Sequence, residues 1–252
     1  MSVHARVDGG VGTVVIDNPP LNVMTSGVRA QLLDAVADFR ARGVRALVVT
    51  GAGTRAFCAG ADLNEERALT PATVQAFLDA DEALFSALSD YPGGVVAAVN
   101  GHAYGGGFEL ALACDIRIAA VSTCLAGVGI TIGLTVSTAR LPRLVGEAVA
   151  KDLLLTGRPV SAEEALGLGL VSAVVPDDAL SSEARTWAET IASRAPLSVQ
   201  ANKAGLRHCA RRPLDEAVAY ERGEWARLQR TRDHVEALHA FFEKRAPTFT
   251  GE

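Results

Sequence analysis

The chain has 252 residues, of which 49% are hydrophobic and 21% charged, and this ordinary globular composition excludes a disordered protein. Its 24 Lys and Arg residues against 29 Asp and Glu residues give a net charge of −5, which gives no electrostatic reason to expect nucleic acid or a membrane as partner. The 4 cysteines form no C-x-x-C pair, and the first residues lack the apolar segment of a signal peptide. We therefore expect a cytoplasmic protein made of one large domain, or of one domain with an appendage.

The first half of the chain alternates β-branched runs with helical patterns. Two runs flank a glycine-rich turn and predict a hairpin, Val3–Val7 with Thr13–Ile16. Buried strands are predicted at Arg45–Thr50 and Val95–Val99. Such alternation predicts a parallel sheet with crossover helices.

Two helices are predicted between these strands. Thr25 or Ser26 can cap the first, which continues to Arg42 and ends before Gly43. Thr70, followed by a proline, predicts the start of the second. The apolar residues that we expect on one side of the second helix are Val74, Phe77, Leu78, Leu84, Phe85 and Leu88.

The second half is predicted to be mostly helical, after one more strand at Leu170–Val175. Four helical patterns follow, punctuated by prolines: Ser181–Arg194, Leu197–Cys209, Leu214–Gln229 and His234–Glu243. The stretch Ile118–Ala139 carries no formal charge, but Ser, Thr and Gly are spread through it. We interpret it as buried strand and loop, not as a membrane span.

Several familiar motifs are absent or incomplete. Residues Gly51–Ala56 match the loose dinucleotide pattern G-x-G-x-x-A, but the residues that follow have no helical periodicity. The chain contains no G-K-S/T phosphate loop, no G-x-S-x-G nucleophile elbow and no H-E-x-x-H zinc motif. These patterns favour neither a nucleotide cofactor nor a metal.

A single carboxylate stands out in an apolar segment. Glu109 is the only Asp, Glu, Lys or Arg between Tyr91 and Cys114, and a helix that begins near Gly106 is expected to be buried around it. Burying an unpaired carboxylate is unfavourable. Glu109 is therefore either a structural partner, for instance of an arginine from elsewhere in the chain, or a group used in chemistry.

Two glycine-containing turns accompany this carboxylate. Gly105–Gly107 joins a strand end to the helix start, where backbone N–H groups are free and no side chains obstruct a ligand. The loop Ala59–Asp62 is a second turn of this kind. If the preceding strands are parallel neighbours, two N–H groups can converge on one oxygen and stabilise a developing oxyanion.

Five segments carry a resemblance to a known family along nearly the whole chain: Pro20–Met24, Phe57–Leu63, Val99–Asp115, Leu155–Val171 and Ala240–Pro247. In this order they resemble the crotonase (enoyl-CoA hydratase/isomerase) superfamily. The resemblance implies an α/β fold, a spiral of ββα units with a C-terminal helical trimerisation region. It places a core with the acyl-CoA site in residues 1–195 and the helical region in residues 196–252.

The resemblance also implies a site. Members of the family bind an acyl-coenzyme A thioester and hold its oxygen on two backbone N–H groups, which match Ala61 and Gly106 here. Residues implied in CoA binding are Ala59, Asp62, Leu63 and Lys244, the lysine acting in some relatives on a neighbouring subunit. We expect a homotrimer or dimer of trimers, with coenzyme A as part of the substrate and no separate cofactor.

The sequence departs from the family pattern at one catalytic position. Glu109 matches one of the two glutamates that hydratases use, but Gly129 stands where the second is expected. Our first hypothesis is an enoyl-CoA hydratase-type lyase in which Glu109 alone activates or delivers water. The alternatives are an isomerase, decarboxylase or thioester hydrolase on the same scaffold, and a non-catalytic acyl-CoA binding protein.

Overall fold

A six-stranded sheet is the centre of the computed structural model, which describes residues 2–252. The strand order is β1-β2-β3-β5-β7-β10, with β1 and β2 antiparallel and the other pairs parallel. The strands are β1 (Val3–Asp8), β2 (Val11–Ile16), β3 (Ala46–Gly51), β5 (Gly94–Val99), β7 (Ile116–Ala120) and β10 (Ala173–Val175). The predicted hairpin and the parallel α/β sheet are confirmed.

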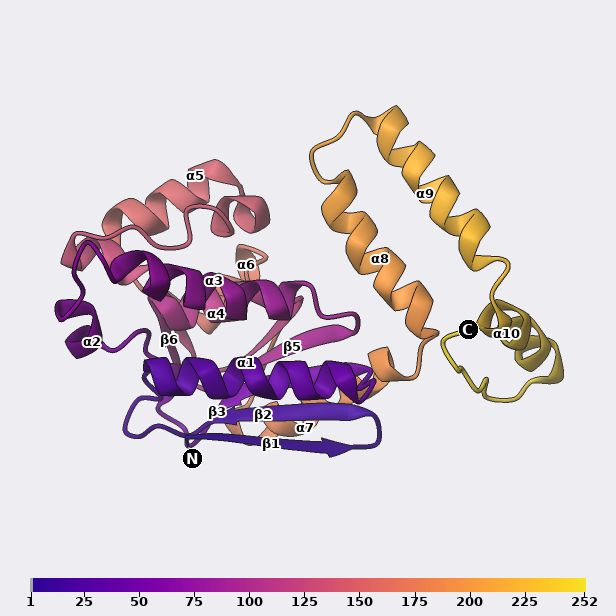
Figure 1. Ribbon diagram of the computed structural model, residues 1–252, viewed down its shortest axis with the longest axis horizontal. Helices are drawn as coiled ribbons and strands as arrows, with labels where there is room; N and C mark the ends of the chain where they lie inside the picture. The colour runs from indigo at the N-terminus through magenta and orange to yellow at the C-terminus, as the bar shows by residue number, and fades with distance from the viewer. Residues whose placement is uncertain (1) are drawn as a thin grey trace.

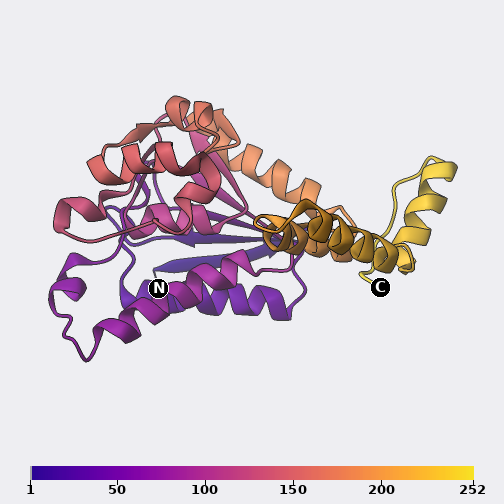
Figure 2. The same cartoon turned by 90° about the horizontal axis from the view of Figure 1, so that it is seen from above.

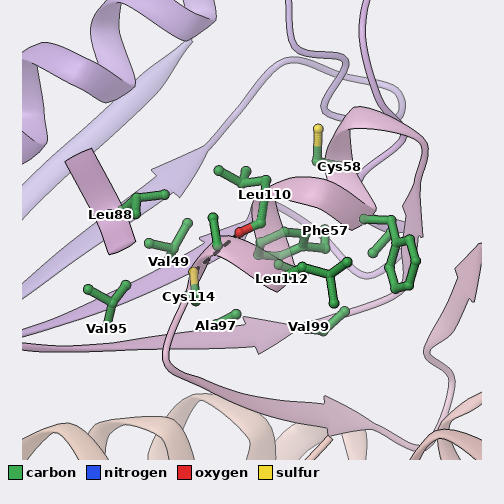
Figure 3. Close-up of a cluster of buried hydrophobic side chains, with 14 of the residues drawn as sticks. Val49, Phe57, Cys58, Leu88, Val95, Ala97, Val99, Leu110, Leu112 and Cys114 are labelled. Carbon is green, nitrogen blue, oxygen red and sulfur yellow. Dashed lines mark hydrogen bonds between the residues drawn. The ribbon is translucent and has the colours of Figure 1, made fainter. Parts of the chain in front are cut away.

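Helices cover both faces of this sheet, because successive side chains of a strand point to opposite faces. The helix α7 (Leu180–Ala192) packs on the face that carries Val48 and Val96. The other face is covered by α1 (Ser26–Ala41), α3 (Val74–Ser89) and α4 (Gly106–Ala113). Figure 3 shows Leu110 and Leu112 of α4 in one buried cluster with Val95 of β5.

A second, smaller sheet positions the glycine turns. It has the order β4-β6-β8-β9 and consists of β4 (Ala56–Cys58), β6 (His102–Tyr104), β8 (Cys124–Ala126) and β9 (Val160–Ser161). Its strands β4 and β6 are parallel neighbours, so their carboxyl ends lie at one edge. The short helix α2 (Leu63–Arg67) follows β4, and α4 follows β6.

The last helices extend away from the sheets, as both views show (Figures 1 and 2). They are α8 (Pro196–Cys209), α9 (Leu214–Leu228) and α10 (Arg232–Glu243), each close to its predicted bounds. The chain also forms α5 (Leu141–Thr156), α6 (Ala162–Gly167) and 3-10 turns at Val128–Ile132 and Asp177–Ala179. In the described residues, none of the helices combines the length and apolarity needed to cross a bilayer.

Two local predictions are wrong. The helix α3 starts after Thr73 and not at Thr70, because the Thr73 hydroxyl accepts from the Thr70 N–H at 2.9 Å, which folds these residues into a separate turn. Only the second half of α3 is buried, whereas Val74 and Leu78 are 38% and 52% exposed.

The uncharged stretch also differs from its interpretation as buried strand and loop. Its first part forms β7 and β8, but Ile130, Ile132 and Leu134 lie on the surface. The later part of the segment is a 3-10 turn and loop, and these three side chains point away from the core.

Candidate active site

The amides of Ala61 and Gly106 lie side by side at the edge where β4 and β6 end. A Cβ atom placed on Gly106 would be 3.4 Å from the Ala61 nitrogen, and one on Gly60 would be 3.3 Å from the Gly106 nitrogen. Within residues 2–252, neither N–H donates to a protein acceptor. Two adjacent, unpartnered donors can bind one oxygen atom together.

Glycine is required where the two turns touch. A Cβ on Gly107 would lie 1.9 Å from the Cys58 carbonyl oxygen, a distance that no side chain permits. Gly60 has φ +106°, and its Cβ would lie 2.9 Å from the Tyr104 carbonyl oxygen. Because these positions are glycine, the loop after β4 can pack directly against the first turn of α4.

Glu109 lies in that first turn and is 7% exposed. One carboxylate oxygen accepts from the Ser137 hydroxyl, and the other accepts from Nη1 of Arg140 at 2.5 Å. The alternative that Glu109 pairs with an arginine from elsewhere is therefore realised. The pair lies three residues from the Gly106 amide, so it is part of the site and not remote from it.

Arg140 links Glu109 to α3. Its Nη2 donates to both oxygens of Glu82 at 3.0 and 3.1 Å, and its guanidinium lies 5.5 Å from the centre of the Phe85 ring. Burial alone would lower the pKa of Arg140, but the hydrogen bonds and charges of Glu109 and Glu82 outweigh it and raise that pKa. The guanidinium therefore stays a fixed positive charge beside Glu109.

Ser137 has an unusual backbone for its position. Its φ is +60°, in the left-handed region that few residues other than glycine adopt, and the residue is 6% exposed. This conformation places its hydroxyl against Glu109. Such strain at a polar residue is typical of a functional segment.

A second ion pair lies next to this one on α3. Arg29 donates from Nε to Asp81 at 2.5 Å, and its guanidinium lies 4.5 Å from the centre of the Phe77 ring. Burial raises the pKa of Asp81, Arg29 opposes that shift, and the negative charge of Glu109 adds to it. The pair lies one residue along α3 from Glu82, which shares Arg140 with Glu109.

The position expected for a second glutamate, Gly129, is buried and tightly packed. Gly129 is buried in the 3-10 turn Val128–Ile132. A Cβ there would meet the Leu134 carbonyl oxygen at 3.0 Å and the Val136 side chain at 3.2 Å. Neither neighbour is acidic, so no carboxylate enters the site from this turn.

The residues implied in CoA binding fall into two groups. Ala59 precedes Gly60, the Asp62 carboxylate caps α2 by accepting from the Asn64 N–H at 2.7 Å, and Leu63 begins α2 with 59% exposure. Lys244 ends α10, at the opposite end of the molecule from α2 (Figures 1 and 2). The single chain therefore brings the loop residues together but does not bring Lys244 to them.

A groove of about 1110 Å³ lies beside the site and not at the paired amides. It runs between the core and α8, with lining residues that include Leu112, Leu144, Lys203 and Leu206. Arg140 also lines it, so the guanidinium that binds Glu109 forms part of the groove wall.

The sequence did not identify Ser137, Arg140, Arg29, Asp81 or Glu82 as site residues. Arg140 offered the clearest signal, since it is the first charge after the uncharged stretch 118–139. The other four sit in ordinary helical or loop patterns, and only their position in space connects them with Glu109.

The chain is similar to known proteins over nearly its whole length. A model of the enoyl-CoA hydratase/isomerase family matches residues 6–252. The chain is 38% identical to (E)-benzylidenesuccinyl-CoA hydratase of Thauera aromatica, covering 100% of both, and 36% identical to short-chain-enoyl-CoA hydratase of Clostridium acetobutylicum, covering 97% of this chain and 95% of that protein. The crystal structure of enoyl-CoA hydratase from Bacillus anthracis has a TM-score of 0.96 and 34% identity over 100% of both chains. The chain belongs to the enoyl-CoA hydratase/isomerase family of the crotonase superfamily.

Proposed function

We propose that the protein is an enoyl-CoA hydratase that adds water across the α,β double bond of an acyl-CoA thioester. The observation that carries the proposal is the pair of unpartnered amides, Ala61 and Gly106, three residues from a carboxylate. The hydratases among the relatives, at 36% and 38% identity, support the same reaction. Coenzyme A enters as part of the substrate.

The two amides have a defined task in this proposal. Addition of water at the β-carbon moves negative charge onto the thioester oxygen, and the N–H groups of Ala61 and Gly106 stabilise that charge. Each such donor contributes about 10²–10³-fold in rate. Because Gly60 and Gly107 fix the two turns rigidly, the donors need little reorganisation during the reaction.

Glu109 has the second task. Its carboxylate accepts a proton from water as the oxygen attacks the β-carbon, a contribution of about 10²–10⁴-fold. Its hydrogen-bond donors in the free protein are both side chains, Ser137 and Arg140, so a rotation of either frees a carboxylate lone pair. We propose that substrate binding reorients one of them.

We further propose that the CoA moiety lies along Ala59, Asp62 and Leu63 and that Lys244 of a neighbouring subunit reaches its phosphates. The distance of α10 from α2 within one chain supports this. The extension also exposes large apolar side chains that a homotrimer or dimer of trimers would cover: Leu206, Leu214, Trp225, Phe241 and Phe242, each 68–79% exposed.

One observation favours a second candidate, an acyl-CoA binding protein without catalysis. Gly129 supplies no second acid, and Glu109 is paired with Arg140. Such a protein would retain the amide pair as a binding site only.

Incubation with crotonyl-CoA and with longer and aryl-substituted enoyl-CoAs tests the proposal. We expect loss of the conjugated thioester absorbance and appearance of the 3-hydroxyacyl-CoA by mass spectrometry. Double-bond migration, loss of CO₂ or release of free CoA would instead identify an isomerase, decarboxylase or hydrolase. Calorimetric binding of acyl-CoAs without any turnover would identify the non-catalytic protein.

A further inference from the structure

The two donors to the Glu109 carboxylate come from one turn of the chain. The Ser137 hydroxyl and Nη1 of Arg140 each bind one carboxylate oxygen. The Leu141 N–H donates to the Ser137 carbonyl oxygen at 3.0 Å, which closes the turn. A base that takes a proton from water has to lie within hydrogen-bond reach of that water. Because a glutamate side chain rotates about several bonds, the groups that hold its carboxylate decide whether it can act as this base.

We propose that Arg140 is a positioning residue for Glu109 and that Glu82 in turn holds Arg140 in place. The proposal deepens, and rests on, the hydratase function given above. Arg140 neither gives nor takes a proton in it. The guanidinium keeps one oxygen of Glu109 fixed, while the Ser137 hydroxyl turns away and opens the other oxygen to water.

Contacts on three sides fix the Arg140 guanidinium. Nη1 donates to Glu109 at 2.5 Å, and Nη2 donates to both oxygens of Glu82 at 3.0 and 3.1 Å. The guanidinium carbon also lies 5.5 Å from the centre of the Phe85 ring. Glu82 and Phe85 are three residues apart on α3, so they lie on one side of that helix. The guanidinium therefore links α3 to α4 and has little freedom to rotate.

The two donors to Glu109 differ in the contacts that a movement breaks. The Ser137 hydroxyl turns about a single bond and gives up one hydrogen bond. Movement of the Arg140 guanidinium would break its hydrogen bonds to both Glu109 and Glu82 and separate it from the Phe85 ring. Ser137 is thus the donor that gives way to water.

Glu82 gives Arg140 a second counter-ion. When Glu109 accepts a proton its negative charge disappears, and a half-buried guanidinium without a counter-ion is unfavourable. Glu82 still supplies that negative charge, and the Ser86 hydroxyl, which donates to it at 2.6 Å, holds Glu82 itself in place. Arg140 can therefore stay where it is while the charge of Glu109 changes, and Glu109 is held in the same position for the next turnover.

Arg158 forms a bridge of the same kind at another place. It donates to Asp152 from Nε and Nη2 at 3.1 and 2.6 Å, and to Glu164 from Nη2 at 2.7 Å. This bridge links α5 to α6. Within residues 2–252, its hydrogen bonds do not reach Glu109. An arginine that joins two carboxylates only to stabilise the fold would give the same result at Arg140 as at Arg158, which makes Arg158→Met the matched control.

Steady-state hydration of an enoyl-CoA that the wild type accepts separates positioning from a structural role. Arg140→Met should lower kcat by about 10²-fold, the effect of misplacing a reacting group by about 1 Å. KM should change little, because the amides of Ala61 and Gly106 still bind the thioester oxygen. Arg140→Lys keeps the charge but not the planar fork, so it should recover part of the loss. Arg158→Met should retain the wild-type kcat.

Glu82→Gln tests the proposal without leaving a buried charge unpaired. Arg140→Met leaves the buried Glu109 with one donor and can fail to fold, whereas Glu82 is 58% exposed. We expect Glu82→Gln to lower kcat by about tenfold or less with little change in the urea midpoint. In the double variant kcat should equal that of Arg140→Met alone, because Glu82 acts through Arg140. Independent effects would instead multiply.

Four results count against these roles. An unchanged or raised kcat in Arg140→Met would overturn the proposal, because removing an arginine that has to leave Glu109 in each turnover would speed the reaction. Equal losses in kcat per folded molecule in Arg140→Met and Arg158→Met would mean a structural effect. A full kcat in Glu82→Gln, or losses that multiply in the double variant, would reject the role of Glu82.

Failure of the hydratase function gives a different result. If the wild type converts an enoyl-CoA by another reaction, the hydratase function is rejected, and kcat of that reaction tests Arg140 with the same variants. If the wild type hydrates an enoyl-CoA and Arg140→Met does so equally well, the hydratase function stands and the positioning role is rejected. Absence of turnover on every acyl-CoA rejects both.

Discussion

Two partly buried ion pairs, Lys203–Asp115 and Arg140–Glu109, differ in the groups that hold them in place. Lys203 of α8 contacts Asp115 at 2.6 Å and also donates to the carbonyl oxygens of Leu88 and Gly93, so all three of its N–H groups are used. Asp115 accepts in addition from the Val95 N–H at 2.8 Å. This pair is tied to the backbone on both sides and fastens α8 to the core.

The pair of Glu109 and Arg140 is tied to side chains instead. Among residues 2–252, the donors to the Glu109 carboxylate are Ser137 and Arg140, and Arg140 shares its guanidinium with the exposed Glu82. Side chains rotate far more easily than backbone moves. The difference suggests that a pair anchored on the backbone serves stability, whereas one anchored on side chains beside free amides can be rearranged by a substrate.

The largest expected effect is on catalysis. Glu109→Gln keeps the size and an acceptor but removes the charge, so hydration of enoyl-CoA should fall by about 10²–10⁴-fold. The free energy of unfolding should fall by about 1.5–3 kcal/mol, the range of one hydrogen bond to a charged group. Steady-state kinetics and urea unfolding measure the two. Full activity combined with a large loss of stability would show that Glu109, like Asp115, has a structural role.

The reverse result is expected at the other pair. Lys203→Met leaves the Asp115 carboxylate with only the Val95 N–H, and an ion pair broken on one side costs about 3 kcal/mol. The midpoint of chemical unfolding should drop, while the activity per folded molecule stays unchanged. Lys151→Met, which removes a surface pair with Glu147 on α5, is the control and should be nearly neutral. A loss of activity without a loss of stability would contradict the structural role of Lys203.

Ser137→Gly tests the hydrogen bond to Glu109 and the left-handed backbone of Ser137 together. The variant loses a hydrogen bond to a charged group, worth about 1.5–3 kcal/mol, but glycine relieves a left-handed backbone that costs about 1–2 kcal/mol. Stability should therefore change little, while hydration falls about tenfold because Glu109 loses a positioning donor. Ser137→Ala keeps the strain and should be the less stable of the two variants. Thermal unfolding in parallel with kinetics would show whether that order is wrong.

The smallest effect concerns an ion pair on the surface. The hydrogen bond from Arg245, with a further one from the Thr248 N–H, lowers the pKa of Glu236 from 4.5 to about 2. A lowered folded-state pKa stabilises the tail after α10 above pH 4.5, and this contribution is lost as the pH falls toward 2. NMR of the Glu236 carboxyl carbon should show a midpoint near 2 in the wild type and nearer 4.5 in Arg245→Met. A wild-type midpoint near 4.5 would mean that the tether does not form.

The sequence predicts best what depends on local rules. Thr25 caps α1 and Arg42 ends it, as capping preferences and Gly43 indicate. Strand ends were expected before both glycine turns, but the bounds of the three-residue strands β4 and β6 were not predicted, because so short a run has no measurable alternation. Even so, the glycines that follow these strands indicated that the amides of Ala61 and Gly106 lie at one edge of the sheet.

The hydrogen-bond partners of Glu109 could not be predicted from local sequence patterns. A buried acid in an apolar helix implies either a partner or a use, but the distance from Glu109 to Arg140 depends on how α5 packs near α4, which no local pattern encodes. The pairing of Arg29 with Asp81 likewise depends on the packing of α1 against α3.

The exposed position of Trp225 on α9 has a practical consequence. The indole is 68% exposed in the single chain, whereas that of Trp187 is half-buried and donates to Glu183 at 2.7 Å. One fluorophore thus lies on the surface that the proposed homotrimer would cover, and the other lies on a helix packed against the sheet. Emission from the pair offers a label-free record in which quenching of Trp225 follows association and the signal of Trp187 follows unfolding.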